Sequence, residues 1–319
     1  METLAISFVL FTFSFVGIEG FRRFAIKKRV MIDVPNERSS HLRATPRGAG
    51  VIFVVLCLLG SFFETQNVWF TLGALLVCSI SFIDDLWSLP AGIRLFFHFL
   101  GAFLVVYFST EFSFFSLLGI FWIAWLINAY NFMDGIDGIA AMQALTAGTG
   151  WIFVGFFFEL SFIKTVSLFL VTTVLGFILH NFSPARVFMG DVGSAFLGYG
   201  FATLPLIVQD RRLFVFGLMS VFLFVFDTTF TLFRRIYNGE KFWQAHRSHL
   251  YQRLVISGLS HGQVTFLYGF LSVVNTFFGF VYLIKGSLLY TLSLPVSVFL
   301  ILFLVFYKER RERSSGGCL

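Results

Sequence analysis

The sequence predicts an all-helical protein that crosses a membrane many times, and two observations carry this prediction. First, 57% of the 319 residues are hydrophobic and only 13% are charged, whereas soluble domains carry roughly 25% charged residues. Second, the apolar residues form runs close to the roughly 20 residues that a membrane-spanning helix needs. No segment between the runs is long enough to fold as a separate soluble domain. We therefore expect a single integral membrane domain over residues 1–319.

The apolar runs predict ten or eleven spanning helices, and several runs are shorter than 20 residues, so some helices are expected to be short. The first run is interpreted as a retained span because no basic segment precedes it, as one would in a cleaved signal peptide. The 48 Phe and 28 Gly residues are typical of helices packed in lipid. The predicted spans are 3–21, 49–63, 67–83, 92–109, 113–127, 139–158, 162–180, 192–208, 213–233, 264–284 and 287–307.

The distribution of Lys and Arg predicts the orientation of these spans. With eleven spans, 19 of the 23 basic residues fall in the loops and the tail on one side. Cytoplasmic loops are enriched in Lys and Arg, so this side is predicted to be cytoplasmic, with a periplasmic N-terminus and a cytoplasmic C-terminus. The net charge of +6 then follows from topology and does not indicate nucleic-acid binding.

Four polar segments interrupt the apolar pattern, and all four fall on the predicted cytoplasmic side. They are Asp84-Asp85, residues 128–138 (NAYNFMDGIDG), residues 181–191 (NFSPARVFMGD) and residues 245–253 (AHRSHLYQR). Polar and charged side chains are costly near lipid. The four segments together predict an active site for a metal ion and phosphate, formed by the cytoplasmic loops 22–48, 84–91, 128–138, 181–191 and 234–263.

Asp84 and Asp85 end the third predicted span. Adjacent carboxylates repel each other unless a cation lies nearby, and Mg²⁺ bound together with substrate phosphates is a common solution. Taken alone, however, the pair is more often a solvated helix end. Arg94 follows on one face of the next helix, four residues before His98. Arg94 could bind a phosphate or anchor its helix at the membrane interface.

Asn131, Asp134 and Asp137 recur every three residues and would share one face of a helical turn. Glycines beside them permit close approach of a ligand. This face, with Asn128 at the start of the segment, could offer carboxylates and amides to a nucleotide or a metal. The alternative is a turn in which Asp137 caps the next helix. The density of polar residues favours the binding site.

Asp191 lies near the expected start of the eighth span, three residues after Phe188. A helix N-terminus favours a carboxylate and also binds phosphate, so Asp191 is either a helix cap or part of a site. Phe188 could stack on a base or simply pack in the protein. Asn181 and Arg186 are further candidates for substrate binding in the same loop.

His246 and His249 are three residues apart, with Arg247 between them. No cysteine or third histidine nearby completes a zinc site. Contact with phosphate or pyrophosphate is therefore favoured, and a basic interfacial loop is the alternative. Asp227 lies inside the ninth predicted span, where an acid either pairs with a neighbouring helix or serves in catalysis. No role is assigned to His41.

The three cysteines do not indicate a disulfide framework or a zinc site. Cys57 and Cys78 lie within apolar runs, and Cys318 lies in the polar C-terminal tail. The tail is expected to be a solvated basic end, and no function is assigned to it.

Five strings occur in the order of a known family: DVPNERSSH with TPRGAG, DDLWSLP, NAYNFMDGIDG, VFMGDVGS and HRSHLYQRL. Together they resemble the polyprenyl-phosphate N-acetylhexosamine-1-phosphate transferases over nearly the whole chain. The peptidoglycan lipid I translocases of this family have three consecutive histidines in the last string, where this chain has His246-Arg247-Ser248-His249. The difference resembles the O-antigen-initiating branch and argues against a muramoyl-pentapeptide donor.

The resemblance implies a reaction and a setting. A sugar-1-phosphate passes from a UDP-sugar to undecaprenyl phosphate, UMP is released, and synthesis of O-antigen or another surface polysaccharide begins. The reaction requires Mg²⁺, with Mn²⁺ as an alternative ion. The enzyme would lie in the bacterial inner membrane, face the cytoplasm and form a homodimer. The donor sugar stays open, and residues 234–263 are expected to select it.

The motifs of the family also imply roles for individual residues. Asp191 matches the principal Mg²⁺ ligand, and Asp84 and Asp85 match the acid pair near the metal and the lipid phosphate. The nucleotide-binding wall matches Asn131, Asp134, Asp137 and Phe188. The pyrophosphate contacts match His246, Arg247 and His249. Direct attack by the lipid phosphate is favoured over a covalent aspartyl intermediate, which the sequence leaves open.

Three other functions fit the sequence less well. A membrane transporter with an interfacial acidic site is the main alternative, but transporters place polar residues near the bilayer midplane on broken helices. An intramembrane aspartyl protease would need a GxGD string, which the sequence lacks. A CDP-alcohol phosphotransferase would need a longer spacing of acids and arginine.

Overall fold

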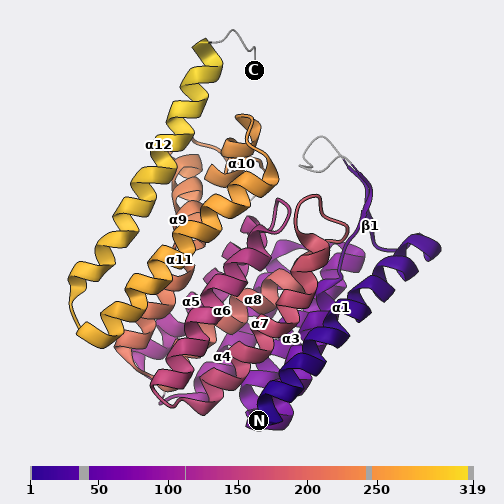
Figure 1. Ribbon diagram of the computed structural model, residues 1–319, viewed down its shortest axis with the longest axis vertical. Coiled ribbons are helices and arrows are strands. Elements are labelled where there is room, and N and C mark those ends of the chain that lie inside the picture. The colour runs from indigo at the N-terminus through magenta and orange to yellow at the C-terminus, as the bar shows by residue number, and fades with distance from the viewer. Residues whose placement is uncertain (1, 36–42, 112, 242–245, 315–319) are drawn as a thin grey trace.

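The computed structural model describes residues 2–35, 43–111, 113–241 and 246–314. Within these ranges the chain is almost entirely helical, and the predicted all-helical fold is confirmed (Figure 1). The helices are α1 (Glu2–Lys28), α2 (Gly50–Thr65), α3 (Val68–Trp87), α4 (Ala91–Ser109), α5 (Phe114–Met133), α6 (Ile139–Phe157), α7 (Ser161–Asn181), α8 (Gly190–Val208), α9 (Arg211–Tyr237), α10 (Leu250–Ile256), α11 (His261–Lys285) and α12 (Ser293–Ser314), with a 3-10 turn at Leu288–Leu292.

Ten helices of the described chain are long and apolar enough to cross a membrane. The predicted span at 49–63 corresponds to α2, which is apolar but shorter than these ten. The polytopic fold is therefore confirmed, and each predicted run coincides with one helix. α1 and α9 extend past their predicted ends at 21 and 233, because their last turns carry basic residues that end the apolar run without ending the helix.

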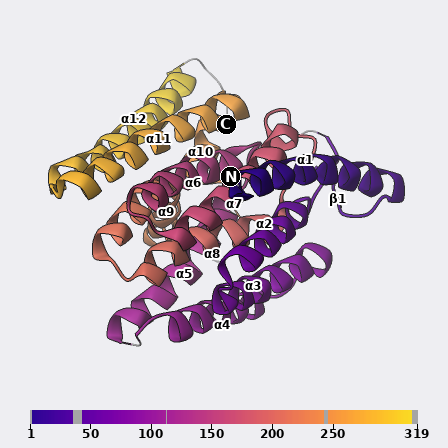
Figure 2. The same ribbon diagram turned by 60° about the horizontal axis from the view of Figure 1, so that its bottom comes forward.

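Helix α8 forms the centre of the bundle, and Figures 1 and 2 both show it surrounded by other helices. Of its spanning window 78% is buried inside the protein, compared with 17% for α12 and 22% for α1. Small residues permit this close packing, as in other membrane bundles. A Cβ atom at Gly198 would lie 2.5 Å from the backbone oxygen of Leu126 on α5. The central position of α8 fixes the place of Asp191 in its first turn.

The up-and-down course of the helices brings alternate connections to the same end of the bundle, which we call the site end. The site end contains the connections α1–α2, α3–α4, α5–α6, α7–α8 and α9–α11, together with the last residues of α12. Figure 1 shows the N-terminus at the opposite end, at the bottom of the view. All four polar segments of the sequence therefore lie at one end, whereas the side of the membrane that they face remains a prediction.

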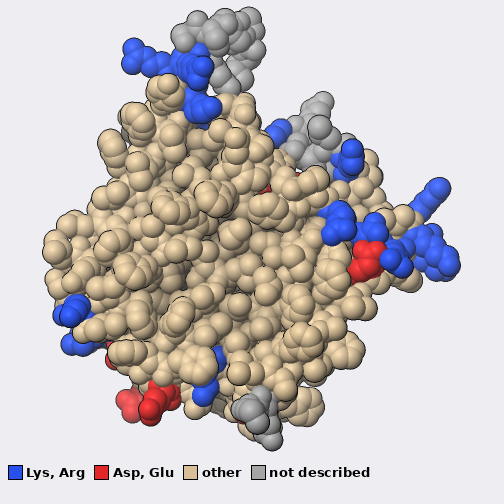
Figure 3. Space-filling view, in the orientation of Figure 1, with Lys and Arg blue, Asp and Glu red and all other residues tan. Residues whose placement is uncertain are grey.

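The surface in Figure 3 is largely uncharged, as expected for a protein surrounded by lipid. Lys and Arg gather mainly near the C-terminal ends of α1 and α12, with fewer at the lower edge, where Asp and Glu also appear. In the connection between α1 and α2, strand β1 (Ile32–Asp33) pairs antiparallel with β2 (Thr45–Pro46). This short ribbon leads the chain into the site at Arg47.

Candidate active site

Five charged residues from four parts of the chain meet at the site end, and we call them the acid–arginine cluster: Arg47, Asp84, Asp85, Arg94 and Asp191. Nη2 of Arg47 lies 2.8 Å from Oδ1 of Asp85 and 2.7 Å from Oδ1 of Asp191. Nη1 of Arg94 lies 2.7 Å from Oδ2 of Asp84 and 3.0 Å from Oδ2 of Asp191. The structure thus brings two predicted polar segments together and adds Arg47, which the sequence analysis had used only to orient the spans.

Asp85 caps the N-terminus of α8 from the neighbouring helix α3. The backbone N–H groups of Asp191 and Val192 donate to its two carboxylate oxygens at 2.9 and 3.1 Å. The side chain of Asp85 is fully buried, at 0% exposed. The alternative in which Asp191 caps its own helix is therefore wrong, because Asp85 occupies that anion site. Both oxygens of Asp85 are held by the protein itself.

Gly190 permits this capping arrangement. Its φ is +73°, a conformation that side chains rarely adopt, and a Cβ atom there would lie 2.5 Å from Oδ2 of Asp85. The glycine of the VFMGDVGS string thus lets the carboxylate of Asp85 approach the helix terminus.

Of the three aspartates in the cluster, Asp84 and Asp191 keep some exposed surface through which they could contact a ligand. Asp191 is the most open, with 17% of its side chain exposed, and Asp84 retains 8%. Both accept from one nitrogen of Arg94, so the two carboxylates already share one cationic partner.

The described residues contain no group of three or more His, Cys, Asp or Glu side chains arranged to hold a metal ion. Mg²⁺, however, binds through one or two carboxylates and completes its coordination with water and substrate phosphates. Asp84 and Asp191 converge on a single nitrogen, which fits such an ion. The residues thus fit a metal bound together with its substrate and not one enclosed by protein ligands.

Asp137 connects three segments at the site end. Its Oδ2 accepts from the backbone N–H of Ala185 at 3.1 Å, and its Oδ1 lies 3.3 Å from Nδ1 of His261. The alternative in which Asp137 caps α6 is wrong, because Gly138 is the N-cap residue and the carboxylate of Asp137 accepts from Ala185 in the α7–α8 loop. Burial raises the pKa of Asp137, but the hydrogen bonds from His261 and Ala185 outweigh burial and hold this pKa below its ordinary value.

Asp134 and Asn131 face the first turn of α8. The amide of Asn131 donates to Oγ of Ser194 at 3.4 Å. Burial raises the pKa of the Asp134 carboxyl well above its ordinary value, and the nearby carboxylates of Asp191 and Asp85 raise it further. Asp134 therefore lies within electrostatic range of the acid–arginine cluster.

Asn128, Asn181 and Arg186, three of the predicted substrate-binding residues, bond to the protein's own backbone. The buried Asn181 accepts from Gly138 N–H at 3.1 Å and donates to the oxygen of Val187 at 2.9 Å, and so ties two loops together. Asn128 donates to the carbonyl one turn earlier in α5. Arg186 is exposed and donates to a carbonyl near the end of α7. These contacts give the three residues a structural role in the ligand-free protein.

Phe188 lies next to the cluster, because its backbone is held on both sides by the segment that carries Arg47. Its N–H donates to the oxygen of Pro46 at 2.8 Å, and its carbonyl accepts from Ala49. Its side chain is half-buried. This position fits the predicted contact with a nucleotide.

The fourth polar segment is positioned by Asp227. This buried carboxylate of α9 accepts from the backbone N–H groups of Leu250 and Tyr251 at 2.8 and 3.0 Å and from the hydroxyl of Tyr268 at 2.8 Å. Nδ1 of His249 lies 3.4 Å from Oδ1 of Asp227. Asp227 thus has the pairing role that the sequence left open, and it caps α10.

The two histidines of this segment differ in accessibility. His249 is buried at 3% exposed, whereas His246 and Arg247 are half-buried. The ring centroids of His246 and His249 are 4.9 Å apart. The hydroxyl of Tyr251 donates to the backbone oxygen of Phe132 at 3.0 Å and fixes α10 beside the end of α5. His246 and Arg247 are therefore better placed than His249 to touch a ligand.

The sequence analysis assigned no site role to Arg47, Tyr251, Tyr268 or His261. Arg47 stands in the TPRGAG string, and this was the available signal. The two tyrosines and His261 could not be recognised, because their partners Asp227, Phe132 and Asp137 are distant in sequence. His41 and Cys318 lie outside the described residues.

Comparison with known proteins decides the family. Residues 67–209, which hold three of the four polar segments, match the family described as glycosyl transferase family 4. The chain is 30% identical over 312 residues to a probable undecaprenyl-phosphate N-acetylglucosaminyl 1-phosphate transferase of Bacillus subtilis, covering 90% of this chain and 85% of the relative. The chain belongs to glycosyl transferase family 4.

Two further relatives show the breadth of the family. A phospho-N-acetylmuramoyl-pentapeptide-transferase of Kosmotoga olearia is 28% identical over 250 residues, covering 70% of this chain and 80% of the relative. A decaprenyl-phosphate N-acetylglucosaminephosphotransferase of Mycobacterium leprae is 32% identical over 117 residues, which are 32% of this chain and 29% of the relative. The family predicted from the five sequence strings is confirmed.

Proposed function

We propose that this family 4 enzyme transfers an N-acetylhexosamine-1-phosphate from a UDP-sugar to undecaprenyl phosphate and releases UMP. The observation that carries the proposal is the acid–arginine cluster at one end of a membrane-spanning bundle. Its carboxylates and guanidinium groups suit a phosphoryl transfer between a lipid and a soluble donor. Similarity to the Bacillus subtilis relative, a probable undecaprenyl-phosphate N-acetylglucosaminyl 1-phosphate transferase, supports the same reaction. We further propose that the site faces the cytoplasm of a bacterium and that the product starts O-antigen or another surface polysaccharide.

Arg47 and Arg94 would neutralise the phosphates of the two anionic substrates. Their side chains are 38% and 31% exposed, and their aspartate partners hold them in place before substrate arrives. Such preorganised charge is the main contribution of a protein to phosphoryl transfer. Mg²⁺ bound by Asp191 and Asp84 would add two further positive charges at the donor diphosphate.

The transfer itself needs little help from a base. The second pKa of a phosphate monoester is about 6, so the lipid phosphate is largely a dianion at neutral pH. One of its oxygens attacks the sugar-bearing phosphorus of the donor, and the bond from that phosphorus to the oxygen of UMP breaks. We favour this direct attack over a covalent intermediate on Asp85, because both oxygens of Asp85 are occupied by the N-terminus of α8.

The donor nucleotide would lie against the second and third polar segments. Asn131, Asp134, Asp137 and Phe188 are proposed to contact the uridine part, and His246 and Arg247 the diphosphate. His249 would not contact the donor itself but would help to hold α10 in place, through its contact with Asp227. The acceptor would enter from the membrane side of the cluster.

The test is an assay with purified protein, undecaprenyl phosphate, Mg²⁺ and a panel of UDP-sugars, with UMP release as the readout. Asp191→Asn should reduce turnover about 10²–10³-fold, as expected for loss of one preorganised electrostatic contact, while the protein remains folded. Lys164→Ala at the opposite end of the bundle is the control and should not change turnover. Normal turnover by folded Asp191→Asn protein would refute the metal assignment. Solute flux in vesicles without UMP release would favour a transporter instead.

A further inference from the structure

The residues His246 and Arg247 are followed along the chain by a very short helix, α10, which has seven residues. Isolated helices shorter than about 12–15 residues are only marginally stable in water, so the position of α10 depends on its contacts with other helices. Asp227 on α9 holds its first turn, and Tyr251 binds the end of α5. A third contact connects α10 to α12, the last helix of the chain.

The third contact is an ion pair between Arg253 of α10 and Glu309 of α12. Nε of Arg253 donates to Oε1 of Glu309 at 2.7 Å, and Nη2 donates to Oε2 at 2.7 Å. Two parallel hydrogen bonds of this kind are stronger and more specific in geometry than a single contact. The two side chains are 13% and 26% exposed, so salt screens them less than a pair on the surface. Cζ of Arg253 also lies 5.7 Å from the ring centroid of Phe306 on α12.

Helix α12 lies at the edge of the bundle in both ribbon views (Figures 1 and 2). Its buried face is narrow. Ser297, Ile301 and Val305 are four residues apart, so they share one face, and each is at most 1% exposed. Oγ of Ser297 donates to Oδ1 of Asn275 on α11 at 3.1 Å. Glu309 follows Val305 by four residues, so the ion pair lies where the buried face of α12 reaches the site end.

A second arginine links the ion pair to the residues that precede α10. Nη2 of Arg234, in the last turn of α9, donates to the carbonyl oxygen of Ser248 at 3.1 Å. Arg234 also lies within electrostatic range of both Arg253 and Glu309. The hydroxyl of Ser248 lies 2.9 Å from Nδ1 of His246. A short series of contacts therefore connects Glu309 with His246, which is proposed to contact the donor diphosphate.

We propose that Arg253 and Glu309 are positioning residues, through which α12 holds His246 and Arg247 in the orientation that binds the donor diphosphate. This inference rests on the proposed function and adds α12 to the elements that form the donor site. The ion pair acts through the position of α10, because Glu309 binds the guanidinium group of Arg253 on two sides. Acceptor binding should not depend on the pair, because the acid–arginine cluster lies on α3, α4, α8 and the residues before α2.

Two matched substitutions test the proposal by activity. Glu309→Ala should raise the KM for the UDP-sugar about fivefold, the effect of losing one partly exposed, charged hydrogen-bonded contact. The KM for undecaprenyl phosphate should stay unchanged. Glu19→Ala is the control, because Glu19 accepts two hydrogen bonds at 2.8 Å from Arg22 on α1, which packs mainly against α7. The control should change neither KM. If Glu309→Ala folds poorly, Glu309→Gln removes the charge with little change of shape and should shift the donor KM in the same direction.

A double-mutant cycle tests whether the two residues act through each other. Arg253→Ala should raise the donor KM as Glu309→Ala does, and the double variant should raise it no further than either single change. Effects that multiply in the double variant would overturn the ion pair as the cause. An equal rise of the donor and acceptor KM in Glu309→Ala would also overturn the proposal, because it would indicate a general loss of structure.

Amide hydrogen exchange tests the position of α10 without substrate. Exchange in residues 246–256 should become faster in Glu309→Ala and stay unchanged in Glu19→Ala. Unchanged exchange in both variants would overturn the positioning role. Wild-type protein that releases no UMP with any donor would instead refute the proposed function, whereas the exchange result would still report on the ion pair. The two failures can therefore be told apart.

Discussion

The N-termini of α8 and α10 are both capped by a buried carboxylate from another helix, but the two carboxylates have different surroundings. At α8, the buried carboxylate of Asp85 binds the N–H groups of the first turn from a neighbouring helix. At α10, the buried carboxylate of Asp227 does the same. The neighbours of Asp85 are partly exposed charged groups, whereas Asp227 is surrounded by His249, Tyr268 and Thr231, which are all buried.

The comparison separates residues that hold the site from residues that can react. A carboxylate that is enclosed and fully hydrogen-bonded positions a helix, and its open neighbours meet the ligand. By this criterion Asp85 and Asp227 are positioning residues, and Asp191, His246 and Arg247 are candidates for contact with substrate. Asp84 is intermediate, because it is 8% exposed and its two oxygens accept from Leu89 N–H and from Arg94. Substitutions at these residues test this division.

Asp85→Ala and Asp84→Ala should differ most. Removing Asp85 leaves the α8 N-terminus and Arg47 without their buried partner, and loss of one member of a buried pair costs about 3–5 kcal/mol in the free energy of unfolding. Asp84→Ala should lower stability less but abolish UMP release. Thermal unfolding in detergent and the UMP assay would measure both effects. A stable, inactive Asp85→Ala protein beside an unfolded Asp84→Ala protein would reverse the assignment.

Gly190→Ala should weaken the first of the two caps. A residue forced to a positive φ costs about 1–3 kcal/mol, and the added methyl group would push against Asp85. Gly92→Ala is the matched control, because a Cβ atom at Gly92 meets nothing within 4 Å. The difference in unfolding midpoint between the two variants measures the effect. Equal midpoints would show that α8 tolerates displacement of its cap.

Asp227→Ala should weaken the second cap. Loss of a helix cap costs about 0.5–2 kcal/mol, and amide hydrogen exchange in residues 246–256 should become faster. The KM for the UDP-sugar should rise, because His246 and Arg247 lose their support. Tyr268→Phe removes one of the hydrogen bonds and should cause a smaller change of the same kind. Unchanged exchange in both variants would show that Asp227 does not position α10.

The smallest effect concerns the pH dependence of stability. The pKa of Asp137 is lowered in the folded protein, so its contribution to stability is complete above its unfolded pKa of about 3.9. The contribution is lost as the pH falls below that value and through the folded pKa. Asp137→Asn should therefore flatten the acid limb of the unfolding midpoint measured from about pH 6 to pH 3. An acid limb identical to that of wild type would contradict the role of the Asp137 carboxylate.

The sequence was sufficient to predict the helices, because the length and composition of each apolar run report directly on a spanning segment. The meeting of the polar segments followed from the alternation of the spans. The sequence alone could not distinguish Asp84 from Asp85, which are chemically identical neighbours. They leave α3 in different directions, one toward Arg94 and the other toward α8. Only the packing of α3 against α8 decides which is the cap.

Tertiary contacts also decide the partners of other polar residues. Asp137 and Asp191 were considered as caps of the helices that follow them, but the structure places both carboxylates against partners distant in sequence. Asn181 is still predicted to bind substrate, and in the structure it also ties two loops together. Local sequence indicates that a polar residue needs a partner, and tertiary contacts decide which partner it finds.

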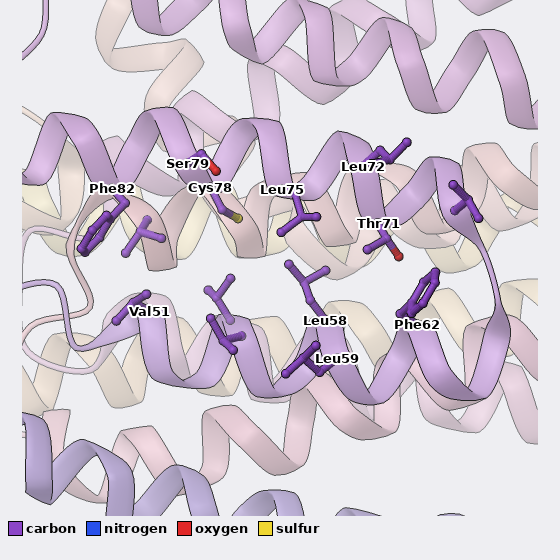
Figure 4. Close-up of a pocket in the computed structure, with 14 residues that line it drawn as sticks. Val51, Leu58, Leu59, Phe62, Thr71, Leu72, Leu75, Cys78, Ser79 and Phe82 are labelled. Atoms are coloured by element: carbon purple, nitrogen blue, oxygen red, sulfur yellow. The ribbon is translucent and has the colours of Figure 1, made fainter.

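The helices α2 and α3 are connected at both ends, and a groove separates them in the middle (Figure 4). At one end Gln66 and Asn67 join the helices, and at the other the ion pair of Arg47 with Asp85 ties the residues before α2 to α3. The arginine that would meet the phosphate therefore also ties the chain before α2 to α3.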